Sequence, residues 1–92
     1  MKVKTPAVGM ICVSTQGRDK GNVYAVQAVS SERFVLVVDG IRAKLDSPKR
    51  KNLKHLSLTP KNISEYGVNF SNGKVYDCNI AYALKQYIQS KI

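Results

Sequence analysis

The first sixty residues carry short apolar runs separated by turn signals, a pattern that is typical of a small antiparallel β structure. Runs rich in apolar and β-branched residues predict strands, and clusters of glycine, aspartate, asparagine and serine separate them. Because the links are short, consecutive strands must be antiparallel neighbours. The expected strands cover residues 8–14, 22–30, 33–38, 41–45 and 55–59.

The strand expected at 33–38 is apolar on both of its faces. Phe34, Leu36 and Val38 point to one face, whereas Val35 and Val37 point to the other. A strand of this kind needs cover on both sides. In so small a protein, one face would line a strongly bent barrel and the other would lie beneath a helix or a terminal segment. The sequence therefore predicts a mainly β fold, a small β-barrel with a C-terminal helix packed outside it.

The last third of the chain predicts that helix over about 78–91, with Asp77 as its N-cap. Among the aromatic residues, Phe34, Tyr82 and Tyr87 are expected to pack in the core or between the helix and the barrel. The apolar stripe expected on the helix has helical spacing and consists of Ile80, Leu84, Tyr87 and Ile88.

Positive charge is the strongest feature of the composition. The 92 residues include fifteen Lys and Arg against six Asp and Glu, a net charge of +9. The charge is concentrated in residues 41–62, where seven basic residues face one acidic residue, a local net of +6. A small domain with this charge is expected to meet an anionic partner.

The remaining composition argues against a membrane protein and against a metal site. The longest apolar run, residues 34–38, is far shorter than a membrane span. The apolar stretch near the N-terminus is too interrupted for an export signal, so we expect a cytoplasmic protein with reduced thiols. Cys12, Cys78 and the single histidine, His55, are too scattered for a structural zinc site. We therefore expect no metal and no cofactor.

An enzymatic function is also disfavoured by the residue types present. No Ser-His-Asp arrangement can be placed, and a single histidine offers little acid–base chemistry. The carboxylates of the first half, Asp19, Glu32, Asp39 and Asp46, all fall at expected turns, where such groups usually cap backbone or solvate loops. We therefore expect a non-enzymatic protein with no catalytic residues and no small-molecule substrate.

The first candidate binding feature is a loop in which Gly17 and Gly21 flank Arg18 and Lys20. It is not the phosphate loop of nucleoside triphosphatases, because it lacks the glycine spacing, the Lys-Ser/Thr pair and a following helix. Two glycines would still let the backbone turn sharply and approach a phosphate closely. The alternative is a plain hairpin turn with solvated charges.

The second candidate is the basic run at residues 49–55, KRKNLKH. Lysine meets phosphate as a point charge and arginine in a bidentate way, whereas Asn52 and His55 add directional hydrogen bonds. The alternatives are a solvated loop or a localisation tag, and for His55 alone a structural histidine. Leu53 and Leu56 argue against a loose tag because they favour burial.

The order of these segments resembles a KOW motif. The residues that carry the resemblance are the strand VGMICV at 8–13, the loop GRDKG at 17–21, the strand FVLV at 34–37 and the turn DG at 39–40. The continuation KRKNLKHL at 49–56 is similar to the segment that follows this motif in the archaeal-eukaryotic large-subunit ribosomal protein fourteen family. The resemblance covers roughly residues 7–60. Residues 61–92 match poorly, with a nearly neutral helix in place of a longer basic extension, and in this the chain looks more like the stand-alone bacterial KOW proteins.

The resemblance implies an SH3-like barrel in residues 1–60 and an extension in 61–92, together in one domain. It also implies binding of ribosomal or other structured RNA, association with the ribosome, and ribosomal proteins as further partners. Carried onto this chain, the implied RNA contacts are Arg18, Lys20, Lys49, Arg50, Lys51, Asn52, Lys54 and His55, with Gly17 and Gly21 forming the loop. Charge alone adds Arg42 and Lys44 to this set.

A different class of function uses the same basic surface. SH3-like barrels often serve as protein-interaction modules, so the chain could instead dock on an acidic protein of the transcription or translation machinery. A partner that survives ribonuclease treatment would favour this alternative.

Overall fold

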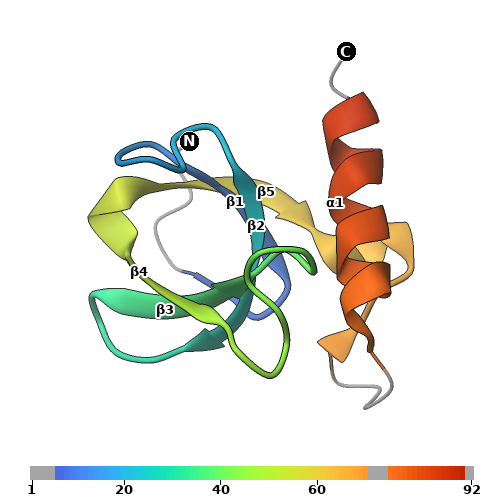
Figure 1. The fold of residues 1–92 in the computed structure, drawn as a ribbon, viewed down its shortest axis with the longest axis horizontal. Coiled ribbons are helices and arrows are strands. Elements are labelled where there is room, and N and C mark those ends of the chain that lie inside the picture. Colours follow the sequence, from blue (N-terminus) through green and yellow to red (C-terminus); the bar gives the residue numbers. More distant parts are fainter. Residues whose placement is uncertain (1–5, 71–74, 91–92) are drawn as a thin grey trace.

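The computed structural model describes residues 6–70 and 75–90 (Figure 1). Its strands are β1 (Met10–Ser14), β2 (Val23–Val29), β3 (Phe34–Val38), β4 (Lys49–Asn52) and β5 (Leu56–Asn62). Two short 3₁₀ helices, η1 (Leu53–His55) and η2 (Ile63–Tyr66), follow β4 and β5, and the α-helix α1 (Asp77–Ser90) comes last.

The five strands form one antiparallel sheet in the order β4-β3-β2-β1-β5. The register shifts in β1 between Met10 and Cys12 and in β2 between Val26 and Ala28, and such bulges increase the bend of a sheet. The sheet curls so that η1 connects its two edge strands (Figure 1). The mainly β fold with a C-terminal helix is thus confirmed. The expected closure into a barrel is not found, because β4 and β5 remain edges of the sheet.

Both faces of the curled sheet are covered, as the apolar pattern of the third strand requires. On the inner face, Cys12, Tyr24 and Val37 are buried in one cluster. On the outer face, Ile11 and Val38 are buried in a second cluster, which the helix completes. The alternation of side chains along each strand therefore supplies two separate cores from one sheet.

Helix α1 packs on the outer face beside η2 and β2 (Figure 1). Ile80, Leu84 and Tyr87 of the expected stripe are buried, and Ala83 completes the buried set. The inclusion of Ile88 in that stripe is wrong, because Ile88 is 45% exposed.

The expected packing of Tyr82 is also wrong, because its side chain is 60% exposed. Asp77 begins the helix instead of preceding it, and its carboxylate accepts a hydrogen bond from the backbone N–H of Leu45 at 2.7 Å. The expected last helical residue, Lys91, lies outside the described residues.

The strand expected at 41–45 is a loop, and the fourth strand is instead the basic run itself. The loop, residues 39–47, is organised by Asp39, whose Oδ1 accepts hydrogen bonds from the backbone N–H groups of Ile41, Arg42 and Ala43 at 2.8–2.9 Å. A backbone held in this way cannot offer the same N–H groups to a neighbouring strand. Residues 49–52 pair with β3 in its place.

Candidate nucleic-acid interface

The glycine loop, residues 15–22, joins β1 to β2 as a tight connection. Gly17 and Gly21 have φ of +88° and +92°, a left-handed conformation that glycine adopts at low cost. The N–H of Gly21 donates to the carbonyl oxygen of Ser14 at 2.8 Å, which closes the base of the loop. Arg18 and Lys20 are both exposed. The loop therefore presents two cations from a defined backbone.

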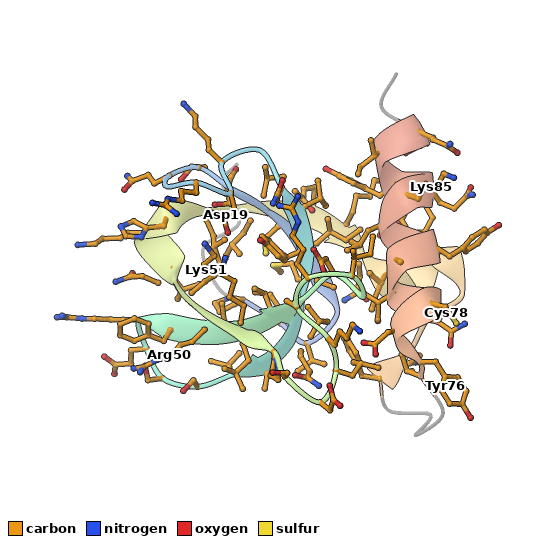
Figure 2. All side chains as sticks on the ribbon, in the orientation of Figure 1. Asp19, Arg50, Lys51, Tyr76, Cys78 and Lys85 are labelled. Carbon is orange, nitrogen blue, oxygen red and sulfur yellow. The ribbon has the colours of Figure 1, made fainter. Side chains whose placement is uncertain are left out.

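Asp19, between those two cations, turns inward and is 8% exposed. Its Oδ1 accepts a hydrogen bond from Ser14 Oγ at 2.9 Å, and its Oδ2 accepts one from the Tyr24 hydroxyl at 2.9 Å. The same Oδ2 forms ion pairs with Lys51 Nζ and, at 3.1 Å, with Lys49 Nζ. Figure 2 shows Asp19 and Lys51 pointing toward each other across the curled sheet. One buried carboxylate thus ties the glycine loop to β4.

The charge of Asp19 is stabilised by these contacts. Burial alone would raise the pKa of Asp19, because it disfavours the charged form. The hydrogen bonds that it accepts, the strongest from Lys51, outweigh burial and hold its pKa well below its usual range. The hydrogen bond to Asp19 in turn raises the pKa of Lys49. Asp19 and Lys49 therefore both stay charged throughout the neutral pH range.

The alternation along β4 divides its basic side chains between two faces. Lys49 and Lys51 face Asp19, whereas Arg50 points the other way and its guanidinium lies 4.1 Å from the centroid of the Phe34 ring. The stack follows from the register, in which Phe34 opposes Asn52, two residues along from Arg50 and on the same face. Arg50 is therefore an exposed cation held in one orientation by an aromatic ring.

The segment after β4 is joined to the glycine loop by a second contact. The carbonyl oxygen of His55 accepts a hydrogen bond from the N–H of Thr15 at 2.9 Å. Asn52 Oδ1 accepts one from the N–H of Lys54 at 3.1 Å, so it caps η1. Lys54 is exposed and His55 is half-buried. The glycine loop, β4 and η1 together form one surface, which we call the basic face.

The structure brings together most of the candidate residues that the sequence indicates, with two exceptions. Lys51 lies on the basic face, but its side chain is only 13% exposed, against 49% for Lys49, so it is far less accessible to a partner. Arg42 and Lys44 are exposed, but they lie in the loop that follows β3, outside the basic face.

Sequence reasoning missed Asp19, Tyr24 and Phe34 as organisers of the basic face. From the sequence, Asp19 was interpreted as an ordinary turn carboxylate, because its cationic partners are some thirty positions away in the chain. The Lys-x-Lys spacing of residues 49–51 could have indicated a shared acidic partner, since residues two apart in a strand lie on the same face.

Two other kinds of site can be tested against the described parts of the chain. Within them, no three His, Cys, Asp or Glu residues gather closely enough to hold a metal ion. Among the described helices, none is both long and apolar enough to cross a membrane.

Comparison with known proteins indicates which family the chain resembles. No family model matches the chain. It is, however, 34% identical over 56 residues to the large ribosomal subunit protein eL14 of Methanococcus maripaludis strain C7. The similarity is to a ribosomal protein. The eL14 proteins of M. maripaludis strain C6 and of Methanococcus vannielii are 32% and 30% identical over the same length.

These matches cover 61% of this chain and 66% of each eL14 protein, just under two thirds. They support a distant relationship to the eL14 family, at 30–34% identity. The chain and these eL14 proteins each have a part outside the matched segment.

Proposed function

We propose that this protein is a non-enzymatic, ribosome-associated relative of eL14 that binds structured RNA, ribosomal RNA first of all, through its basic face. The observation that carries the proposal is the double tie between the glycine loop and the β4–η1 segment, through Asp19 and through the Thr15–His55 hydrogen bond. It sets cations from two distant parts of the sequence on one rigid surface. The similarity to eL14 makes the ribosome the natural location of that RNA.

The chemistry expected at the basic face is phosphate binding. Arg18, Lys20, Lys49 and Lys54 would neutralise phosphates, and the stacked Arg50 would present its guanidinium edge for bidentate contact with a phosphate or a guanine. Most of the affinity would come from release of counterions, with the shape of the loop choosing the RNA site. Lys51 and Asn52 would act indirectly, by holding the loop and η1 in place.

The remaining expectations follow from this proposal. The KOW motif would correspond to the glycine loop and its flanking strands, and the protein would act in the cytoplasm, with ribosomal proteins as neighbours. Arg42 and Lys44 would be auxiliary contacts to an RNA that extends past the basic face.

The direct test is ultraviolet crosslinking of the tagged protein in its own cells, followed by sequencing of the attached RNA. We expect reads clustered at a small number of positions in the large-subunit ribosomal RNA, and sedimentation with ribosomal particles that ribonuclease abolishes. The proposal would be contradicted by crosslinks spread evenly over cellular RNA, or by a complex that survives ribonuclease with no RNA attached.

A further inference from the structure

A second exposed surface lies on the helix side of the molecule, between α1, the start of β2 and the loop after β3. It is a groove of about 740 Å³. Val23 and Leu84 line it, and the three large apolar side chains exposed on its walls are Ile41 at 69%, Tyr82 at 60% and Ile88 at 45%. A small protein rarely gathers exposed apolar groups in one place without an interaction to use them.

The loop wall of the groove is held in shape by two kinds of contact. Asp39 Oδ1 fixes the loop by accepting from the N–H groups of Ile41 and Arg42. Gly40 lies so close to α1 that an added Cβ would stand 2.1 Å from the carbonyl oxygen of Asp77. The loop is therefore pressed against the helix, with Ile41 turned outward. A preformed wall of this kind lowers the entropy cost of binding.

The rim of the groove is positively charged. Arg42 lies on the loop side and Lys85 on the helix side, and neither forms an ion pair with any residue that the structure describes. Among the described residues that line the groove, the one carboxylate is Asp39, and it is committed to the backbone of its own loop. Figure 2 shows Lys85 on α1 at the opposite side of the view from Arg50, and the groove meets the basic face only at Gly21 and Asn22, the end of the glycine loop.

The chemistry of the groove favours one occupant. Its apolar lining is mostly aliphatic, which suits aliphatic side chains better than nucleobases, whose polar edges need hydrogen-bond partners. A second copy of this chain would bring another net charge of +9 against the same basic rim. A segment with one apolar face and flanking carboxylates meets both the lining and the rim.

We infer that this groove binds an acidic amphipathic segment of a partner protein. The apolar face of the segment lies on Ile41, Tyr82 and Ile88, and its carboxylates pair with Arg42 and Lys85. This interaction uses no cation of the basic face, and it shares with the proposed RNA only the auxiliary contact Arg42. It gives the protein a second surface, through which an RNA-bound copy can hold another protein.

The test uses a synthetic sixteen-residue helical peptide with leucine at positions i, i+3, i+4 and i+7, one glutamate on each side of that leucine face, and alanine and glutamine elsewhere. A control peptide has the same composition in an order without helical periodicity. Each is titrated into the ¹⁵N-labelled full chain, and amide shifts are followed. We expect saturable shifts at residues 39–42 and 81–89, with the periodic peptide binding at least about tenfold more tightly than the control.

Variants at exposed positions complete the test, because substitutions at such positions are expected to change stability little. Ile88→Ser and Lys85→Glu should each weaken binding of the periodic peptide by roughly five- to tenfold. Arg33→Glu makes the same charge change as Lys85→Glu at an exposed turn outside the groove, and should alter affinity less than about twofold. Equal affinity for both peptides, or shifts confined to β4 and residues 15–20, would overturn the inference. So would a single-stranded oligouridylate that shifts the groove amides while the peptide does not.

Discussion

Replacing Asp19 by asparagine should destabilise the protein far more than a change of one charge on a surface turn. The substitution keeps the shape of the side chain and the Oδ1 acceptor used by Ser14. It replaces Oδ2, which accepts from Tyr24, Lys49 and Lys51, by an amide that donates. The buried end of Lys51 then loses the negative partner that offsets its desolvation.

The size of the effect follows from the exposure of the two lysines. Lys49 has a side chain 49% exposed and can return its charge to water, whereas Lys51 at 13% cannot do so without moving. Removing one partner of a buried ion pair costs about 3–5 kcal/mol. Because Lys49 can be rehydrated, we expect the lower end, about 3 kcal/mol. For a domain of this size that lowers the melting temperature by roughly 15 °C.

The assay is equilibrium urea unfolding followed by circular dichroism at neutral pH. Asp46→Asn is the matched control, because Asp46 is exposed in a loop, and it should change the free energy of unfolding by less than about 0.5 kcal/mol. If Asp19→Asn were as stable as Asp46→Asn, the contacts of Asp19 between the glycine loop and β4 would contribute nothing to the stability of the fold.

The same pair of proteins gives a pH signature with a defined sign. The pKa of Asp19 is lowered in the folded protein, so its contribution to stability is present above its unfolded pKa of about 4. That contribution is lost as pH falls from there toward the lower folded pKa. The stability difference between wild type and Asp19→Asn should therefore be constant near neutrality and shrink below about pH 4. A difference that grows on acidification would contradict the assignment.

Three further predictions test other parts of the structure. Gly40→Ala should lower the free energy of unfolding by about 3 kcal/mol or more, because the added Cβ meets the backbone of α1. Gly21→Ala has a similar φ but open space around it, so it should lower the free energy of unfolding by about 1 kcal/mol. Equal unfolding midpoints for the two variants would contradict the contact between Gly40 and α1. Cys78 should react rapidly with a thiol reagent in the folded protein, and Cys12 only after unfolding, since burial raises its pKa to about 12; two fast thiols would contradict this. Burial also raises the pKa of Tyr24, so stability should fall above about pH 10 and fall less steeply in Tyr24→Phe; parallel pH profiles would show that Tyr24 is not involved.

The order of strands and the helix followed from the sequence because they depend on local signals. Alternating apolar residues placed β1, β2 and β3, and helical spacing placed α1 to within a residue or so at its start. Residues 41–45, which lie in the loop at 39–47, were predicted as a fourth strand. A single carboxylate, Asp39, instead captures the N–H groups that the strand would need.

The sequence identified the charged residues of the candidate site, but not how they are placed relative to one another. The basic run and the glycine loop are visible in the chain, yet the carboxylate that joins them depends on a contact between residues thirty positions apart. The charge count also treated Lys49, Arg50 and Lys51 alike. Strand alternation separates them. Lys49 is half-exposed and forms an ion pair with Asp19, Arg50 stacks on the Phe34 ring, and Lys51 is mostly buried against Asp19.

The measurement that tests the central claim most directly is the salt dependence of binding to purified ribosomal RNA. We expect the logarithm of the affinity to fall linearly with the logarithm of salt concentration, with a slope of roughly 0.8 per neutralised phosphate. Replacing Arg18 and Lys20 by alanine should lower that slope by about 1.5, since each exposed cation on the basic face accounts for up to one phosphate. Replacing Lys61 and Lys85, which are also exposed but lie outside this face, should leave the slope nearly unchanged. The same loss of slope in both double variants would contradict the account, because charge alone and not its placement would then govern binding.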